Sequence, residues 1–248
     1  MSAGLKYRPE VDGLRAVAVV VVMLFHAGNS AFPGGYVGVD VFFVISGFLI
    51  TSIISKEVDR GSFSFASFYE RRIRRIFPAL YFLLLSVTVA GLVFLTPPEL
   101  RDLGQSVFAT VAFAGNIFFY FKSGYFDPDG EAQPLLHMWS LGVEEQFYIF
   151  FPVLLLVVAR WARRWLIPLL TAIFAAALFA SIALIESQPS GVFYLPHFRA
   201  WELILGCILA LWMRSDAIVH RLSKTSTVLL EILGLALVAL PVTLYNSD

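Results

Sequence analysis

Long apolar runs separated by short polar stretches dominate the chain, and most are longer than a strand or core helix of a soluble domain requires. A helix crosses the hydrocarbon of a bilayer with about 20 mostly apolar residues. By this measure the pattern predicts about seven transmembrane helices. The predicted spans are residues 13–31, 37–55, 76–95, 141–159, 166–185, 198–213 and 227–245. We therefore expect an all-α fold, a polytopic transmembrane helical bundle.

A further apolar stretch, residues 103–121, is interrupted by Gly104, Gly115 and Asn116. Basic residues mark the cytoplasmic ends of spans. They cluster at Arg71–Arg75, Arg160–Arg164 and Arg214–Lys224, with Lys6 and Arg8 at the N-terminus. All these clusters are cytoplasmic if the N-terminus is cytoplasmic and residues 103–121 enter the membrane from outside and return. We therefore predict a re-entrant or interfacial segment, with an ordinary span that breaks the charge rule as the alternative.

Composition supports a membrane protein and narrows its partners. Of the 248 residues, 58% are hydrophobic and only 15% are charged, whereas soluble domains have about 25% charged residues. The formal net charge is zero and no basic tract occurs, so we expect a lipid bilayer and no nucleic acid as partner. The single cysteine, Cys207, excludes an intrachain disulfide and a cysteine cluster for metal. We expect no metal cofactor.

Two ionisable residues stand out in the first predicted span. Arg15 and His26 are eleven positions apart, so on a helix they share one face with a rise of about 16 Å between them. Because ionisable groups in spans face protein or water, we expect the pair to line a groove that runs inward from the cytoplasm. The alternatives are a hydrogen-bonded packing role for His26 and an ion pair of Arg15 with Asp12.

Further charged residues lie at the ends of the second and third predicted spans. Asp40 is either a surface acid near the outer end of span two or part of a pocket wall. Arg72 and Arg75 share one helix face on the cytoplasmic side, next to Arg71 and Arg74. Guanidinium groups bind phosphate oxygens with two parallel hydrogen bonds, so the pair predicts a phosphate-bearing ligand. Anchoring by the positive-inside rule is the alternative.

The stretch LLHMWSLGVEEQFYIFFP, residues 135–152, is the richest in reactive groups. If it is helical from His137, then His137, Ser140 and Glu144 form one stripe at the outer mouth of span four. Glu144 and Glu145 point about 100° apart on a helix. Either can accept a proton from a hydroxyl nucleophile or hold a sugar hydroxyl. The alternative is that one of them faces the lipid headgroups.

Five motifs in order give the chain a resemblance to integral-membrane acyltransferase family 3, whose members O-acetylate bacterial surface polysaccharides. They are YRPEVDGLRAVAVVVVMLFH, GGYVGVDVFFVISGFLI, FYERRIRRIFP, LLHMWSLGVEEQFYIFFP and the weaker FRAWELILG. Family members have about ten spans, so residues 1–248 are expected to form a membrane acyltransferase domain that lacks its C-terminal spans. The resemblance also implies a location in the bacterial cytoplasmic membrane.

The resemblance implies roles for the residues already singled out. Arg15 and His26 are the essential pair; from the charge geometry, not from the resemblance, we expect His26 to act as general base or to carry the acyl group transiently. Arg72 and Arg75 are expected to bind the donor, acyl-coenzyme A. The expected donor is acetyl-CoA. The remaining residues bear on a carbohydrate or glycolipid acceptor such as lipopolysaccharide O-antigen, peptidoglycan or exopolysaccharide. They are the catalytic candidates Glu144 and Glu145 and the substrate-binding candidates Asp40, His137, Trp139 and Ser140. The competing interpretations are a transporter or flippase of an acidic or lipid-linked sugar and an inactive fragment.

Overall fold

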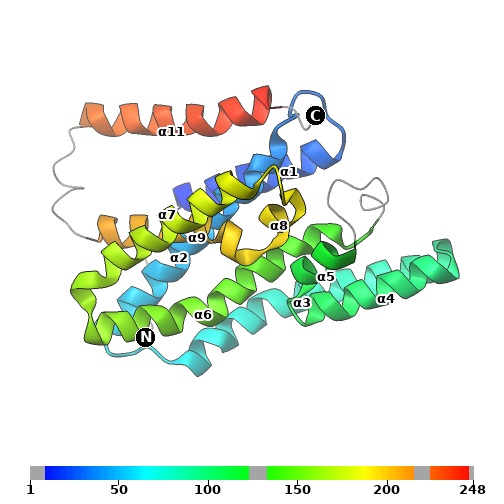
Figure 1. The fold of residues 1–248 in the computed structure, drawn as a ribbon, viewed down its shortest axis with the longest axis horizontal. Helices are drawn as coiled ribbons and strands as arrows, with labels where there is room; N and C mark the ends of the chain where they lie inside the picture. The colour runs from blue at the N-terminus through cyan, green and yellow to red at the C-terminus, as the bar shows by residue number, and fades with distance from the viewer. Residues whose placement is uncertain (1–8, 123–132, 215–223, 246–248) are drawn as a thin grey trace. The chain divides into compact units, whose positions relative to one another are not determined.

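The computed structural model of the chain describes residues 9–122, 133–214 and 224–245, and every regular element in this part is a helix, as predicted (Figure 1). The α-helices are α1 (Pro9–His26), α2 (Gly38–Asp59), α3 (Phe65–Phe94), α4 (Pro97–Val111), α5 (Gly115–Lys122), α6 (Trp139–Trp161), α7 (Leu166–Leu184), α8 (Pro189–Tyr194), α9 (Pro196–Met213) and α11 (Lys224–Leu244). Short 3-10 helices, η1 (Gly35–Val37), η2 (Leu136–Met138) and η3 (Arg163–Trp165), lead into α2, α6 and α7. Three members of the basic clusters that predict the topology lie outside the described residues: Lys6, Arg8 and Arg221.

Among the residues that the structure describes, five helical segments are long and apolar enough to cross a membrane, and they correspond to five of the seven predicted spans. These segments are Gly35–Asp59, Phe65–Phe94, Leu136–Trp161, Arg163–Leu184 and Thr225–Leu244. The other two predicted spans, residues 13–31 and 198–213, correspond to α1 and α9, each of 18 residues. The chain is therefore an integral membrane protein, while the count of seven spans stays a prediction.

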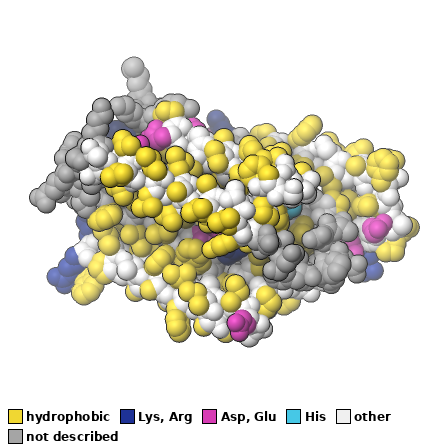
Figure 2. All heavy atoms as spheres, turned by 90° about the horizontal axis from the view of Figure 1, so that it is seen from above, with side chains coloured by type: hydrophobic (Ala, Val, Ile, Leu, Met, Phe, Trp, Pro, Cys, Tyr) yellow, Lys and Arg dark blue, Asp and Glu magenta, His cyan; other side chains and the backbone are white. Residues whose placement is uncertain are grey.

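Large apolar side chains cover much of the outer surface of these helices. Phe82 and Phe94 of α3 are 74% and 82% exposed, and only 6% of the apolar window of α11 is buried. Figure 2 shows one face of the molecule, on which hydrophobic side chains predominate and charged ones are few. Lipid is the solvent that suits such a surface.

Two helix boundaries differ from the predicted spans. α3 begins at Phe65, eleven residues before residue 76, because the stretch FASFYERRIRR continues the helix and buries Phe68. Arg72 therefore lies within α3, on a helix as its predicted face requires. α1 ends at His26, five residues before residue 31, so the imidazole lies at the end of the helix and not in its interior.

The interrupted stretch 103–121 forms two short helices, α4 and α5, of 15 and 8 residues. The break comes at Phe113, whose φ of 53° is unusual for a residue with a side chain, while Gly104 lies inside α4 without interrupting it. At the start of α4, the hydroxyl and the backbone N–H of Thr96 both donate to Glu99 Oε2, at 2.7 Å, which lowers the pKa of that carboxyl. Neither helix alone is long enough to cross a bilayer, and the re-entrant path stays a prediction.

The chain divides into two compact units. The first unit comprises residues up to Ile53, Ile167–Phe174 and the part from Glu202 onward. The second comprises Ile54–Leu166 and Ala175–Trp201, and so contains α3, α4, α5, α6 and α8.

Within the first unit, α2 and α9 cross at two reciprocal glycines. A Cβ on Gly47 would lie 1.8 Å from the carbonyl oxygen of Leu203, and one on Gly206 would lie 1.9 Å from that of Val44. Because these obstacles are backbone atoms, they cannot move aside as a flexible side chain does. The two backbones can therefore approach so closely only because both residues are glycines, which have no Cβ.

This crossing generates a stability prediction. Gly47→Ala or Gly206→Ala forces α2 and α9 apart and costs about 1–3 kcal/mol or more. We expect the apparent Tm of the detergent-purified protein to fall by roughly 5 °C in a thermal unfolding scan.

Gly234→Ala is the matched control, because Gly234 lies in the middle of α11 and a Cβ there would have nothing within 4 Å. It should leave Tm unchanged or raise it slightly, since alanine favours a helix interior by about 0.5–1 kcal/mol over glycine. Equal Tm values for all three variants would contradict the close crossing.

Candidate functional site

In the second unit, an ion pair joins α3 to α6. The Nη2 atom of Arg72 lies 2.5 Å from Glu145 Oε1, and its Nε donates to Oε2 at 3.4 Å. The side chains are only 17% and 11% exposed. Two opposite charges at this distance in a poorly solvated place hold the two helices in one register.

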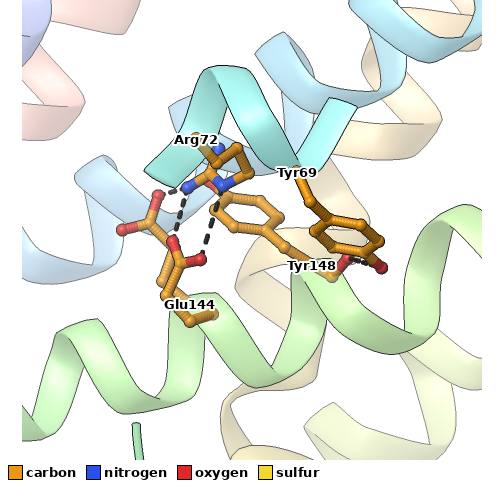
Figure 3. Close-up of polar contacts among 5 residues, drawn as sticks. Tyr69, Arg72, Glu144 and Tyr148 are labelled. Atoms are coloured by element: carbon orange, nitrogen blue, oxygen red, sulfur yellow. Dashed lines mark hydrogen bonds and ion pairs between the residues drawn. The ribbon is translucent and has the colours of Figure 1, made fainter. Parts of the chain in front are cut away.

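A tyrosine lies directly beneath this ion pair. The guanidinium carbon of Arg72 is 3.6 Å from the centre of the Tyr148 ring, so the cation rests on the negative face of the aromatic system. The hydroxyl of Tyr148 donates a hydrogen bond to Glu144 Oε1, one turn earlier in α6. Figure 3 shows Arg72, Glu144 and Tyr148 turned toward one another. The ring itself is buried, with 2% exposure.

The register of α3 against α6 follows from these contacts and those of Tyr69. The hydroxyl of Tyr69 donates to the carbonyl oxygens of Tyr148 and Ile149, both at 3.3 Å. Arg72, one turn later in α3, reaches Glu145, one turn earlier in α6. The two helices therefore run antiparallel where they touch.

These contacts correct one expectation from the sequence. Arg72 was predicted at the cytoplasmic side with the donor, and Glu144 and Glu145 at the outer mouth with the acceptor. The structure brings Arg72 and Glu145 into contact, because α3 begins early and carries Arg72 along the side of α6. Residues predicted for the donor and for the acceptor thus share one cluster, which we call the α3–α6 cluster: Tyr69, Arg72, Glu144, Glu145 and Tyr148.

The other arginines of α3 have different surroundings. Arg71 pairs with Glu57 at 2.8 Å, and Arg74 pairs with Glu70 of the preceding turn at 2.7 Å. Arg75 is exposed and makes no ion pair with any residue that the structure describes. Arg72 and Arg75 were predicted as one phosphate-binding pair, but Arg72 is engaged by a glutamate whereas Arg75 has its donors available.

In the first unit, α1 carries the other predicted pair. The guanidinium of Arg15 packs on the ring of Phe42 at 5.3 Å, and its Nη1 lies 3.8 Å from Asp12, so the alternative pairing with Asp12 is present but long. Its Nε is buried without a hydrogen-bond partner among the described residues. Arg15 is thus fixed on one side while it keeps hydrogen-bonding capacity.

His26 is exposed and is oriented by its own helix. Its Nδ1 lies 2.9 Å from the carbonyl oxygen of Val22, which can only accept, so Nδ1 carries the hydrogen in this contact. In the neutral imidazole the lone pair is then on Nε2, which has no hydrogen-bond partner among residues 9–122, 133–214 and 224–245. This is the protonation pattern that a general base or a nucleophile needs.

The substrate-binding candidates lie in three places. Asp40 is half-buried in the first turn of α2. His137 is exposed in the 3-10 helix η2, so the predicted α-helical stripe begins later than expected, and the hydroxyl of Ser140 donates to the His137 carbonyl oxygen at 3.2 Å. Trp139 is buried at the start of α6, with the Phe193 ring 4.4 Å away and the Arg199 guanidinium carbon 5.4 Å away.

Sequence reasoning missed two groups of residues. Tyr148 was not singled out, although its i+4 spacing from Glu144 places it on the same helix face. The second group is a buried amide pair: Gln146 Nε2 donates to the Phe113 carbonyl oxygen at 2.8 Å and to Asn116 Oδ1 at 2.9 Å. In the sequence, Asn116 stood out only because it interrupts an apolar stretch. Nothing in the residues around it indicates a hydrogen-bond partner 30 residues away.

Comparison with known proteins covers almost the whole chain. The sequence profile of the family described as "Acyltransferase domain" matches residues 8–247. "Peptidoglycan O-acetyltransferase OatA" of Listeria monocytogenes is 37% identical over 228 residues, which are 88% of this chain and 36% of that protein. "O-acetyltransferase OatA" of Staphylococcus aureus is 34% identical over 244 residues, 97% of this chain and 40% of that protein.

No solved structure shows a significant match. The chain spans about two fifths of the length of these relatives. Since the profile covers nearly every residue, including those of α1 and of the α3–α6 cluster, the chain belongs to the acyltransferase family.

Proposed function

We propose that the protein is a membrane O-acyltransferase that moves an acyl group, acetyl by default, from cytoplasmic acyl-coenzyme A to a hydroxyl of a carbohydrate outside the membrane. Two relatives that bear the name O-acetyltransferase, one of them named for peptidoglycan, support this activity and make peptidoglycan the first acceptor to test. The observation that carries the proposal is His26, an exposed imidazole with an oriented lone pair at the end of an apolar helix.

The chemistry requires a base and a place for the departing thiol. The acceptor oxygen attacks the carbonyl carbon of the thioester, the C–S bond breaks, and the hydroxyl proton ends on the sulfur of coenzyme A. As general base, His26 takes this proton at Nε2 and passes it to the thiolate. As nucleophile, Nε2 bonds to the acyl carbon as the C–S bond breaks and the thiolate leaves. The acceptor oxygen then takes the acyl group from Nε2, and its proton ends on the thiolate.

The cations of the chain suit a donor rich in phosphate. Arg75 is exposed and makes no ion pair with any described residue, and we assign it to the phosphates of acyl-coenzyme A. Arg15, on α1, stays a separate candidate for donor binding. Arg72, whose charge Glu145 balances, contributes by keeping α3 in register with α6 and so fixing the position of Arg75. Asp40, His137, Trp139 and Ser140 remain candidates for contact with the acceptor.

The two glutamates take different roles in this proposal. Glu145 neutralises Arg72 and is 8% exposed, whereas Glu144 is more exposed and its carboxylate is held by Tyr148. Glu144 is therefore the acid that can reach an acceptor hydroxyl. Glu145 serves as the counter-ion.

For the topology, we propose a cytoplasmic N-terminus, a location in the bacterial cytoplasmic membrane, and a re-entrant segment formed by α4 and α5. The break at Phe113 supports the last of these. Arg160 then lies at the cytoplasmic surface, and fifteen residues of α6, about 22 Å, separate it from Glu145. The α3–α6 cluster falls within the roughly 30 Å of hydrocarbon, where a charge needs a protein partner.

His26→Ala tests the function directly. In membrane vesicles supplied with acetyl-CoA and a peptidoglycan acceptor, we expect release of free thiol to fall at least about 100-fold, since the base is lost. His197→Ala is the control, because His197 is also exposed but belongs to no proposed role. Near-normal turnover by His26→Ala would refute the proposal, and acetyl-CoA-independent sugar movement would favour a transporter.

The Arg72–Glu145 pair predicts a thermodynamic coupling. Arg72→Met or Glu145→Met alone leaves a poorly solvated charge without its partner and is expected to cost about 3 kcal/mol. The double variant should cost less than the sum of the single variants, measured by thermal unfolding. Arg74→Met is the control, because its pair with Glu70 is 78% and 58% exposed and contributes about 0.5 kcal/mol or less. Additive costs at positions 72 and 145 would contradict the coupling.

Labelling of single cysteines tests the topology. In a Cys207→Ala background, Ser62→Cys should react with a membrane-impermeant maleimide only after the cytoplasmic face is opened. Ser187→Cys, just after α7, should react in intact cells if α4 and α5 return to the outer side. The reverse pattern at position 187 would show that residues 103–121 cross the membrane.

A further inference from the structure

We propose that Tyr148 is a positioning residue that fixes both Glu144 and Arg72 for acyl transfer without touching the substrates. This inference rests on the proposed function and extends it to a residue that no motif argument selected. Its basis is that one side chain contacts an acid and a cation through two different parts, the hydroxyl and the ring.

The ring of Tyr148 acts on Arg72. At 3.6 Å from the ring centre, the guanidinium group lies flat enough on the aromatic face to be in van der Waals contact with it. The hydrogen bonds of Nη2 and Nε to Glu145 restrict the group from the side, and the ring restricts it from below. Arg72 is therefore held in one orientation, with its charge at a defined distance from Glu144.

The hydroxyl of Tyr148 acts on Glu144. It donates to Oε1 from the next turn of the same helix, which restricts rotation of a carboxylate that is otherwise half-exposed. The charged and titratable groups near this carboxylate are Arg72 on α3 and Glu145 and Tyr148 on α6 (Figure 3). The Tyr148 hydroxyl donates to one oxygen of this carboxylate, and the charge of Arg72 acts on the same carboxylate.

Burial excludes a direct role in the chemistry. Tyr148 is 2% exposed, and its backbone carbonyl accepts from the Tyr69 hydroxyl, so the residue is fixed at both ends. A substrate cannot reach the ring without displacing Arg72. The residue therefore acts through its two neighbours, and each contact can be removed separately.

Tyr148→Phe keeps the ring beneath Arg72 and removes only the hydrogen bond to Glu144. We expect kcat for acetyl transfer in vesicles to fall about tenfold with an unchanged KM for acetyl-CoA, the size expected for one hydrogen bond to a charged group. Tyr148→Leu also removes the aromatic face, so the KM for acetyl-CoA should rise about fivefold as well. Tyr81→Phe is the control for activity: Tyr81 also lies on α3, but its side chain is exposed and it belongs to no proposed site, so kcat should stay unchanged.

A double-mutant cycle separates positioning from general loss of structure. If the hydroxyl acts through Glu144, then Glu144→Gln and Glu144→Gln/Tyr148→Phe should have the same kcat. Additive losses would overturn the proposal, as would an unchanged kcat in Tyr148→Phe.

An infrared readout makes the contact testable without turnover. The carboxylate band of the purified protein that disappears in Glu144→Gln should shift in Tyr148→Phe and stay in place in Tyr69→Phe. A band that does not move in Tyr148→Phe would overturn the proposal even if the enzyme is active. Absence of acetyl transfer by the unaltered protein would instead refute the proposed function, and with it the role in transfer, while the band would still report the contact.

Discussion

The site depends on one requirement: a charge placed among apolar helices must find its counter-charge within the protein. Arg72 and Glu145 meet this requirement across α3 and α6, and no lipid can replace either partner. Their contact sets the antiparallel register of the two helices, brings Tyr148 beneath the guanidinium group and leaves Glu144 as the more exposed acid. The geometry of the cluster is thus a consequence of charge neutralisation in a medium that cannot solvate charge.

The two halves of the proposed chemistry are prepared in different ways. On α1, the backbone orients the side chain: the Val22 carbonyl oxygen receives Nδ1–H, and the tautomer of His26 follows. On α6, side chains orient one another, because Glu144, Glu145 and Tyr148 are close enough in sequence to share one face and still reach α3. The orientation of His26 depends only on its own helix, whereas the orientation of the α6 side chains depends on α3 and α6 packing in register.

Local pattern was sufficient to predict the helices, and it also selected candidate site residues whose roles stay predictions. Apolar run length located the five long helices, and motif spacing selected Arg15, His26, Arg72 and both glutamates. It failed where a helix extends through polar residues, as at Phe65–Arg75. The arginines lower the local hydropathy, so a span predicted from hydropathy begins after them. The helix nevertheless begins earlier, because these residues have favourable helix propensity and Arg74 pairs with Glu70 of the preceding turn.

Contacts between distant segments were beyond the reach of the sequence. The ion pair of Arg72 and Glu145 joins residues 73 positions apart, and the hydrogen bond between Gln146 and Asn116 joins residues 30 positions apart. A single sequence carries no information on which polar residue in one helix faces which in another. Assigning arginines to one membrane surface and glutamates to the other was a consistent reading of charge, and tertiary packing overrode it.

The crossing of α2 and α9 has a consequence for biogenesis. Gly47 and Cys207, in contact at this crossing, are 160 residues apart, so the ribosome must add that length before α2 meets its partner. At about 5–20 residues per second, α2 waits on the order of ten seconds. During this interval the surface of α2 around Gly47 can pack against any other helix in the translocation machinery or the bilayer. Fidelity at this step then depends on kinetics, since the correct neighbour is synthesised 160 residues later.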